Sequence, residues 1–497
     1  MSLLNRLLSL LKKSDRPTND SSAEISNKVS PSTSPAELGR ASRENIISQR
    51  LKRDWTKGSI LKNLLLLSWP MTVTQTLMSL GPTIDMIWVG KLGTIAIAAV
   101  GVSGVAVQLA QGAMMGLNNG VRALIARFVG AQDIPSANRV AQQAIIVCIS
   151  FSVLTGVIGM FLAEEIVSLV TTNTEIISLG ASYLRIQFVG AITINFRLLM
   201  DVIMQGSGDS MNPMQIAIIF RLFHVALCPF MIFGWWIFPE LGVQGAAYTS
   251  VISQCLGIIL GLRILLNNKS RLKLSFRDFH IDFGIIWRII RIGFPSSIAG
   301  IQRSLSQFIL QRFIAPFGAV VLAAYTISQR IEMFFMMPAM SFGMGAGVLV
   351  GQNLGAGEPK RAQKSAWLAV FVVEMFMVVV CLCLFVWTTP VIRIFNSDPV
   401  MDETARQFIH IAIVSWSVMG FNFILMNALQ GAGDTIPTMI ISIVTTWLIT
   451  IPLAYFLPKI TDWGFIGICW AMALSMITGA IANVIYFRTG KWKTRRV

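Results

Sequence analysis

Long apolar runs separated by short polar breaks fill the chain from about residue 60 to residue 488. Twelve of these runs are long enough for an α-helix that crosses the hydrocarbon core of a bilayer, which takes about 20 residues. A helix satisfies its backbone hydrogen bonds within itself, so each run is predicted to span a membrane. Their approximate bounds are 61–89, 95–126, 139–163, 178–206, 213–236, 243–266, 285–314, 320–352, 363–389, 405–430, 435–458 and 464–487.

The twelve runs fall into two sets of six that share sequence features 225 residues apart. Pro70 and Gly93 in the first set match Pro295 and Gly318 in the second. The run QGSGD, which ends at residue 209, has its counterpart in QGAGD, which ends at residue 434. Because six is an even number, both sets keep one orientation, which predicts two pseudo-symmetric six-helix bundles related by an axis along the membrane normal. We therefore expect an all-α polytopic membrane protein with a solute cleft between the bundles.

This pattern divides the chain into five parts. They are a disordered tail (1–57), an N-terminal six-helix bundle (58–266), a basic linker (267–284), a C-terminal six-helix bundle (285–488) and a basic tail (489–497). The first tail begins with MSLLNRLLSLLKK, whose leucines lie on one helical face beside basic residues. This segment is predicted to lie on an anionic membrane surface, and an organellar transit peptide is the alternative interpretation.

Composition supports the membrane class. Hydrophobic residues make up 54% of the chain and charged residues 13%, and the mean hydropathy is +0.67, which excludes an ordinary soluble domain. All six cysteines lie within apolar runs, where they are predicted to be packing residues rather than disulfides or metal ligands. We expect no metal and no cofactor.

The net charge of +16 is explained by membrane topology. If both termini lie in the cytoplasm, the polar breaks and tails on that side hold 28 Lys and Arg residues and the opposite breaks hold four. This asymmetry predicts a multi-pass protein of the cell membrane, either the inner or the plasma membrane, with both termini cytoplasmic. Nucleic-acid binding is not expected, because the sequence has no zinc-ligand spacing and no basic stripe with interleaved aromatic residues.

The first run carries one carboxylate, Asp85, at a place where the second set has Leu310. A charge at membrane depth is costly, so such a group pairs, faces water or takes up a proton. We predict that Asp85 loads and releases a coupling proton, and a purely structural hydrogen bond is the alternative.

Two further ionisable groups of the first set have open interpretations. Asp201 follows Arg197 by four residues, which puts both on one helix face and leaves a coupling role and a plain buried ion pair both open. His224 stands alone in an apolar run, where it either relays protons or packs with one nitrogen satisfied.

The two G-x-G-D turns are predicted to be structural. Their glycines let the chain turn sharply between helices, and the aspartate can accept backbone N–H groups at the start of the next helix. The residues assigned to these turns are Gly206, Gly208, Asp209, Gly431, Gly433 and Asp434.

A polar stripe on the seventh run is predicted to face the cleft, because Arg303, Gln307 and Gln311 recur at three-to-four spacing. Glu374, in the ninth run, is left open between an interfacial, a cavity-facing and a merely tolerated position. The remaining polar residues assigned to the substrate cavity are Arg197, Gln302, Gln329, Arg330 and Glu332.

In combination, the twelve spans, the LVGQNLGAG run (349–357), the paired G-x-G-D turns and the Asp85 helix resemble the multidrug and toxic compound extrusion (MATE) transporters, in the DinF-like branch. The resemblance covers residues 60–488. It implies an alternating-access exporter driven by a proton or sodium gradient, with a cation site in the N-terminal bundle.

In that family the site combines an Asp on the first helix, an Asn on the fourth and an Asn-x-x-x-Asp pair on the fifth. Here these positions hold Asp85, Asp201 and the pair His224-x-x-x-Cys228, and Tyr183 falls where an aromatic hydroxyl commonly supports the site. Arg303 occupies the place of the acid in the sodium site that some relatives have in the C-terminal bundle, so no such site is expected.

The functional hypothesis is a monomeric antiporter, not an enzyme, that exports small amphiphilic solutes or drugs in exchange for H+, or for Na+ as the alternative ion. An organic-acid exporter or a flippase for a lipid-linked precursor remains as the alternative. An intramembrane enzyme is disfavoured because neither HExxH nor GxSxG occurs.

Overall fold

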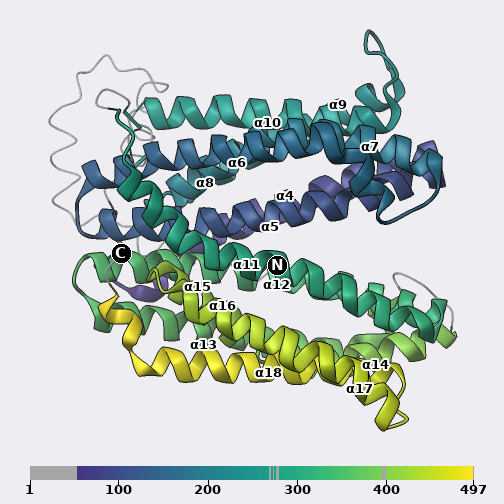
Figure 1. Ribbon diagram of the computed structural model, residues 1–497. Helices are drawn as coiled ribbons and strands as arrows, with labels where there is room; N and C mark the ends of the chain where they lie inside the picture. The colour runs from purple at the N-terminus through teal and green to yellow at the C-terminus, as the bar shows by residue number, and fades with distance from the viewer. Residues whose placement is uncertain (1–52, 268–269, 273, 276–278, 394–398, 496–497) are drawn as a thin grey trace, which may run out of the picture. The chain divides into compact units, whose positions relative to one another are not determined.

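Helices build the whole described part of the computed structural model (Figure 1), which covers residues 53–267, 270–272, 274–275, 279–393 and 399–495. The amphipathic segment predicted at the start of the chain lies outside the described residues, as do parts of the predicted linker. The N-terminal bundle consists of α4 (Ile60–Val89), α5 (Thr94–Gly130), α6 (Ile134–Ser168), α7 (Thr174–Val189), α8 (Ala191–Gly206), α9 (Met211–Phe233) and α10 (Gly242–Leu266).

The C-terminal bundle repeats this order. It consists of α11 (Phe283–Ile314), α12 (Ala319–Gly355), α13 (Pro359–Arg393), α14 (Pro399–Trp416), α15 (Met419–Gly431), α16 (Thr435–Ile443), α17 (Ile451–Ile460) and α18 (Phe465–Thr489), with a π-helical segment (Val444–Thr450) joining α16 to α17.

Nine of the described helices are long and apolar enough to cross a membrane, and two bent helix pairs bring the number to eleven when each pair counts as one span. The remaining helix of the predicted twelve is α4, with 30 residues. It buries the polar residues Asn63, Ser68, Thr74 and Asp85. The prediction of an all-helical fold made of two six-helix bundles is confirmed.

Two predicted spans are not continuous helices. The fourth, predicted over 178–206, consists of α7 and α8 with a 45° bend between them. Gly190 lies at this bend, where a Cβ would clash with Val251 of α10, so glycine is required for the close approach. The tenth, predicted over 405–430, consists of α14 and α15, also bent by 45°. Apolar residues continue through both breaks, which is why the hydropathy pattern does not reveal them.

The two bundles meet closely at the end where α5 and α12 terminate, called here the basic end. A Cβ on Gly130 would clash with the Gln352 carbonyl, and a Cβ on Gly355 would clash with the Arg127 carbonyl. The Gln352 side chain also donates to the Gly206 carbonyl oxygen at 3.1 Å. Backbone-to-backbone contact therefore closes the cleft at this end.

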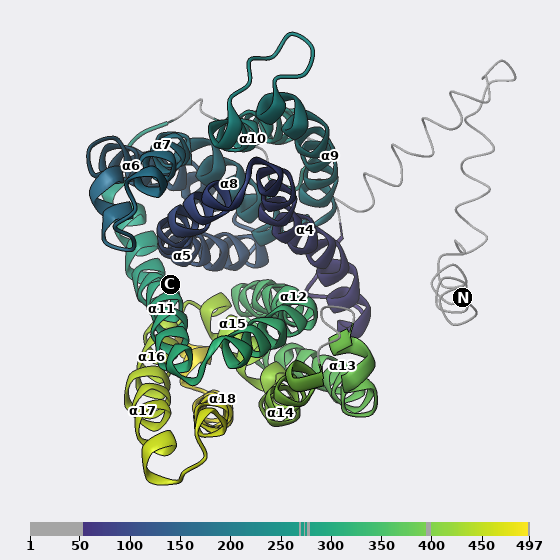
Figure 2. The ribbon, with the colours of Figure 1, turned by 90° about the vertical axis from the view of Figure 1, so that its right-hand side faces the viewer.

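Toward the opposite end the bundles diverge. α5 and α11 lie side by side (Figure 2) as far as Gly112 and Gly300, where a Cβ on Gly300 would lie 2.6 Å from the Gly112 carbonyl oxygen. Nearer the N-terminal end of α5, a Cβ built on Gly101 or Gly104 would have no atom within 4 Å. The described unit is thus closed at the basic end and open at the opposite end.

Helix α4 belongs to both bundles. Its first half, with Leu64, Leu67 and Met71, is part of the apolar core of the C-terminal bundle, and Ser68 lies against Gly345 of α12. Its second half packs on α9. Helix α4 therefore links the core of the C-terminal bundle to α9 of the N-terminal bundle.

Candidate functional site

Three side chains from two other helices of the N-terminal bundle contact Asp85 of α4. His224 Nε2, from α9, lies 3.2 Å from Asp85 Oδ1, and the Cys228 thiol donates to the same oxygen at 3.6 Å. Ser250, from α10, donates its hydroxyl to Asp85 Oδ2 at 3.4 Å. Asp85 is 5% exposed and His224 is 2% exposed, so the cluster is held inside the bundle.

The contacts of His224 define its tautomer. The Arg221 guanidinium lies 3.5 Å from His224 Nδ1, and a guanidinium can only donate. Nδ1 must then accept, which leaves the ring proton on Nε2 and directs it at Asp85. With the thiol of Cys228 and the hydroxyl of Ser250, this arrangement places three donors around Asp85.

Tyr183 belongs to the same cluster at greater distance. It is 7% exposed, accepts a hydrogen bond from Gln187 Nε2 at 3.0 Å, and lies near enough to Asp85 and Cys228 to interact with their charges. The structure thus brings together four of the five residues assigned to coupling, namely Asp85, His224, Cys228 and Tyr183.

Asp201, the fifth, forms a separate pair. Arg197 Nη1 lies 2.6 Å from Asp201 Oδ2, and the two side chains are 1% and 6% exposed. Arg197 also lies over the Phe220 ring, and Gly257 of α10 provides the space for its stem. Among the described residues, Asp201 has no partner besides Arg197. Arg197 therefore lies inside the N-terminal bundle rather than in the cavity to which the sequence assigned it.

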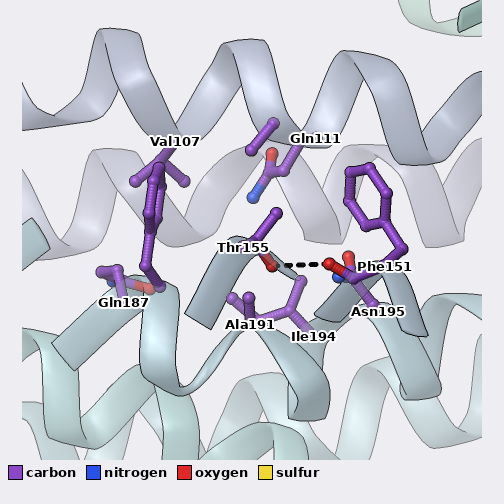
Figure 3. A pocket seen from close by; sticks show the side chains of 10 residues that line it. Val107, Gln111, Phe151, Thr155, Gln187, Ala191, Ile194 and Asn195 are labelled. Atoms are coloured by element: carbon purple, nitrogen blue, oxygen red, sulfur yellow. Dashed lines mark hydrogen bonds between the residues drawn. The ribbon is translucent and has the colours of Figure 1, made fainter. Parts of the chain in front are cut away.

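A small cavity lies where α5, α6, α7 and α8 meet, close to the bend at Gly190. Figure 3 shows Gln111, Gln187 and Asn195 around it, together with Thr155. None of these was assigned to a site from the sequence. The available signal was the presence of amide side chains within apolar spans, where polar groups are uncommon.

A larger cavity, of about 120 Å³, lies inside the C-terminal bundle between α12, α14 and α18. Two residues assigned to the substrate cavity, Gln329 and Glu332, line it. Its walls are aromatic and thioether side chains. They include Tyr325, Phe408, Trp416, Met472 and Met476.

The other assigned cavity residues lie elsewhere in the C-terminal bundle. Gln302 is buried, donating to Ser442 and accepting from Trp447 Nε1 at 3.1 Å. Arg303 is exposed on α11 and reaches Met426 Sδ of α15 at 3.9 Å. The residues Gln307, Gln311 and Arg330 are also exposed.

The two G-x-G-D turns hold φ angles that favour glycine, +92° at Gly208 and +82° at Gly433. Asp209 accepts from the Asn212 backbone N–H at 3.3 Å, as expected of a cap, and also from Ser270 at 2.9 Å. Burial raises the pKa of Asp209, and these hydrogen bonds counteract that rise.

The second turn differs in its aspartate. The Asp434 side chain does not cap α16, the helix that follows it. It accepts a hydrogen bond from the Tyr486 hydroxyl instead. The first glycines of the two turns, Gly206 and Gly431, both lie at contacts between helices, where a Cβ on Gly431 would clash with the Gly347 backbone. These turns therefore fix helix ends and helix contacts.

Glu374 has a role that the sequence left open. Its Oε1 accepts the Phe421 backbone N–H at 2.8 Å, at the start of α15. No side chain within the first turn of α15 caps this helix. A carboxylate from α13 thus supplies the acceptor that the break between α14 and α15 requires.

Comparisons with known proteins give one consistent result. The MatE family model matches residues 70–230 and 295–456, one match in each bundle. A relative from Bacillus subtilis, "Probable multidrug resistance protein YpnP", is 26% identical over 89% of this chain and 98% of its own length. "Probable multidrug resistance protein NorM" of Thermotoga maritima is 25% identical over 88% of this chain and 94% of its own length.

Among solved structures, "Crystal structure of MATE in the bent conformation" is similar in fold. It matches 88% of this chain and 96% of its own chain with a TM-score of 0.83 and 22% identity. The repeat in the sequence, the two-bundle fold and the matched relatives all indicate the same kind of protein.

Proposed function

This chain belongs to the MatE family of multidrug efflux transporters, and from that premise we propose that it is a proton-coupled antiporter, of the DinF-like branch, that exports small amphiphilic organic solutes. The observation that carries the proposal is the direct contact of two titratable groups, Asp85 and His224, inside the N-terminal bundle. Such a pair can take up one proton, which converts an aspartate beside a neutral imidazole into a neutral pair, and can give the proton back.

Proton and solute exchange through a shared conformational equilibrium. The described state is closed at the basic end, and the positive-inside rule assigns that end to the cytoplasm. In this state the open end of the cleft releases solute to the exterior, and the protein works as a monomer in the cell membrane with both termini cytoplasmic. Protonation favours one packing of the N-terminal bundle and solute favours the other.

The C-terminal cavity favours a cationic solute. One carboxylate, Glu332, stands among aromatic rings and methionines, which is the combination that binds organic ammonium groups. Methionine side chains adapt to varied shapes, which suits a transporter of several amphiphiles.

A second candidate, an organic acid, is supported by one observation. Arg303 is exposed on α11 beside Gln307 and Gln311, a stripe able to bind a carboxylate. A lipid-linked precursor flippase is less well supported, because a pyrophosphate needs several cations on the cleft and Arg197 is instead paired with Asp201.

The test uses purified full-length protein in liposomes, with a cationic dye and an aromatic acid offered in turn. We expect a pH step to drive dye export and a sodium step to leave it unchanged, and we expect Asp85→Asn to reduce pH-driven export to the level of protein-free liposomes. Export driven by sodium alone, or a fully active Asp85→Asn variant, contradicts the proposal. Transport of the acid in place of the dye supports the second candidate.

A further inference from the structure

The connection between α9 and α10 is an apolar hairpin. Its eight residues, 234–241, read GWWIFPEL and carry one charge, that of Glu240. Trp236 is 92% exposed and Ile237 is 87% exposed. The corresponding connection of the C-terminal bundle, between α17 and α18, has four residues, 461–464. The long apolar hairpin therefore belongs to one copy of the repeat.

The hairpin extends sideways from the N-terminal bundle. It lies at the end of the bundle opposite the basic end, and in Figure 1 it leaves α9 and α10 across the direction of the long helices. Figure 2, which looks along these helices, shows the hairpin outside the outline formed by α9 and α10. A hairpin that continued the helix direction would enter the aqueous phase. One that projects sideways stays near the level at which the spanning helices end.

The tip of the hairpin holds a tryptophan where glycine is usual. The Phe238 N–H donates to the Trp235 carbonyl oxygen at 3.4 Å, which closes a turn with Trp236 at its first central position. The φ of Trp236 is +65°, and turns with positive φ at this position mainly use Gly, Asn or Asp. A bulky side chain is strained there. The backbone thus does not favour Trp236, and its benefit must come from what the side chain contacts.

Aromatic packing fixes the base of the hairpin to α9. The Trp235 ring stacks on Phe233, with centroids 5.9 Å apart, and meets the Phe230 ring edge-on at 5.8 Å. Gly234 ends α9 with a φ of +68°, and a Cβ there would lie 2.7 Å from the backbone nitrogen of Glu240. The base is therefore packed, and the exposed tip keeps a defined position.

The same aromatic cluster reaches a cation. Phe233 packs on Trp88 of α4, with ring centroids 6.1 Å apart, and Lys91 Nζ lies 4.3 Å from the centroid of Trp88. Lys91 is exposed at this end of the bundle. Exposed lysine and tryptophan side chains are the residues that face lipid headgroups at a membrane surface.

We propose that the hairpin is a membrane anchor that inserts Trp236 and Ile237 into the interfacial region of the lipid leaflet at this end. In water both side chains would expose their apolar surface. In the hydrocarbon core the backbone groups of the turn would lack hydrogen-bond partners. The interface meets both needs, because it takes up apolar rings and offers acceptors to the indole N–H. The leaflet thereby holds the N-terminal bundle at a fixed depth.

The experiment places a bimane fluorophore on Trp236→Cys in the full-length protein, reconstituted in vesicles of phosphatidylcholine and phosphatidylglycerol. Cys255 and Cys383, the native cysteines that are not buried, are replaced by serine so that the label is specific. Quenching is measured with iodide in the water and with lipid nitroxides placed either at the headgroup or near the bilayer centre. Thr172→Cys, in the polar turn between α6 and α7 at the same end, is the matched control.

We expect iodide to quench the label at Trp236→Cys several-fold less than the label at Thr172→Cys. The headgroup nitroxide should quench the first label more than the nitroxide near the bilayer centre does. Equal iodide quenching at the two sites overturns the proposal, and so does stronger quenching from the bilayer centre. A label that no quencher reaches also overturns it, because protein, such as a second copy of the chain, must then cover the tip.

Trp236→Gly separates the side chain from the turn, because glycine accepts the positive φ and keeps the hairpin. With the label on Ile237→Cys, adding Trp236→Gly should raise iodide quenching several-fold, and unchanged quenching contradicts the anchor. If Trp236→Cys does not fold, the label on Ile237→Cys decides with the same quenchers. None of these measurements involves transport, so the anchor and the proposed function stand or fail separately.

Discussion

The two bundles share one frame but differ in charge at corresponding positions. At a spacing of 225 residues, Asp85 stands opposite Leu310, and the ion pair Arg197–Asp201 stands opposite Asn422 and Met426. The helix frame was therefore duplicated, whereas these three ionisable positions of the first copy hold neutral residues in the second.

Near a proline late in the fifth predicted span of each bundle the contrast is sharper. Pro229 corresponds to Pro452, and at that spacing His224 corresponds to Trp447. His224 contacts a carboxylate on the first helix of its bundle, whereas Trp447 donates to the neutral Gln302 on the first helix of its own. A neutral pair does not titrate, so the proposed proton coupling belongs to the Asp85–His224 pair and not to its counterpart in the C-terminal bundle.

The largest effect on transport is expected for His224→Gln. This change removes the titratable imidazole, which the corresponding position of the C-terminal bundle also lacks. Glutamine keeps a donor toward Asp85 but cannot carry the proton. We expect pH-driven dye export to fall roughly 100-fold, the low end for loss of a positioned acid–base group. The control is Trp447→Phe, which should keep the wild-type pH profile. An unchanged profile in His224→Gln would remove the contrast between the bundles.

Asp201→Asn should lower stability strongly, because it leaves the buried Arg197 without its counter-charge. We expect a loss of about 3–5 kcal/mol, seen as a lower unfolding temperature in detergent. The double variant Arg197→Met with Asp201→Leu, which copies the neutral character of the C-terminal bundle, should recover most of that loss. A variant of normal stability that has lost proton coupling would instead place Asp201 in the proton pathway.

Gln302→Leu tests the neutral network of the C-terminal bundle. The change leaves the Trp447 indole N–H and the Ser442 hydroxyl without a partner, which should cost about 1–3 kcal/mol in thermal unfolding. The midpoint of the pH profile should not move. A shifted midpoint would mean that this network also takes part in proton coupling.

The smallest effect is expected for Glu332→Gln, which removes the charge from the C-terminal cavity while keeping its shape. Binding of a cationic dye should weaken about tenfold, equivalent to about 1.4 kcal/mol, and binding of an aromatic acid should not weaken. Fluorescence titration measures both. Glu403→Gln, at an exposed acid outside the cavity, is the matched control and should change neither affinity.

The fold was largely predictable because hydropathy records which segments lie in lipid, and a duplicated chain shows its own symmetry. The bends at Gly190 and at residues 417–418 were not predictable, because apolar residues run through both and the causes lie on other helices. Val251 packs against Gly190, and Glu374 caps the second break from α13.

Contacts within one helix follow from residue spacing, whereas contacts between helices, apart from those that the family resemblance implied, do not. The four-residue spacing of Arg197 and Asp201 indicated their pairing, but not that the pair lies within a bundle. The hydrogen bond from Arg221 to the Met78 carbonyl was not predicted. Pro82 leaves this carbonyl without a donor in its own helix, but the sequence does not indicate which other helix supplies one.

The glycine contacts between α5 and α12 bear on the speed of the transport cycle. Surfaces formed by Gly130 and Gly355 carry no long side chains that must change rotamer before the bundles separate. The Gln352 and Arg127 carbonyls that meet there also serve as helix acceptors, so they stay paired when the bundles part, and the side-chain bonds that break are those from Gln352 to the Gly206 carbonyl and from Arg127 to the Ala432 carbonyl. Internal friction at this closure should be low, and the slow step of turnover is expected to lie in proton or solute exchange.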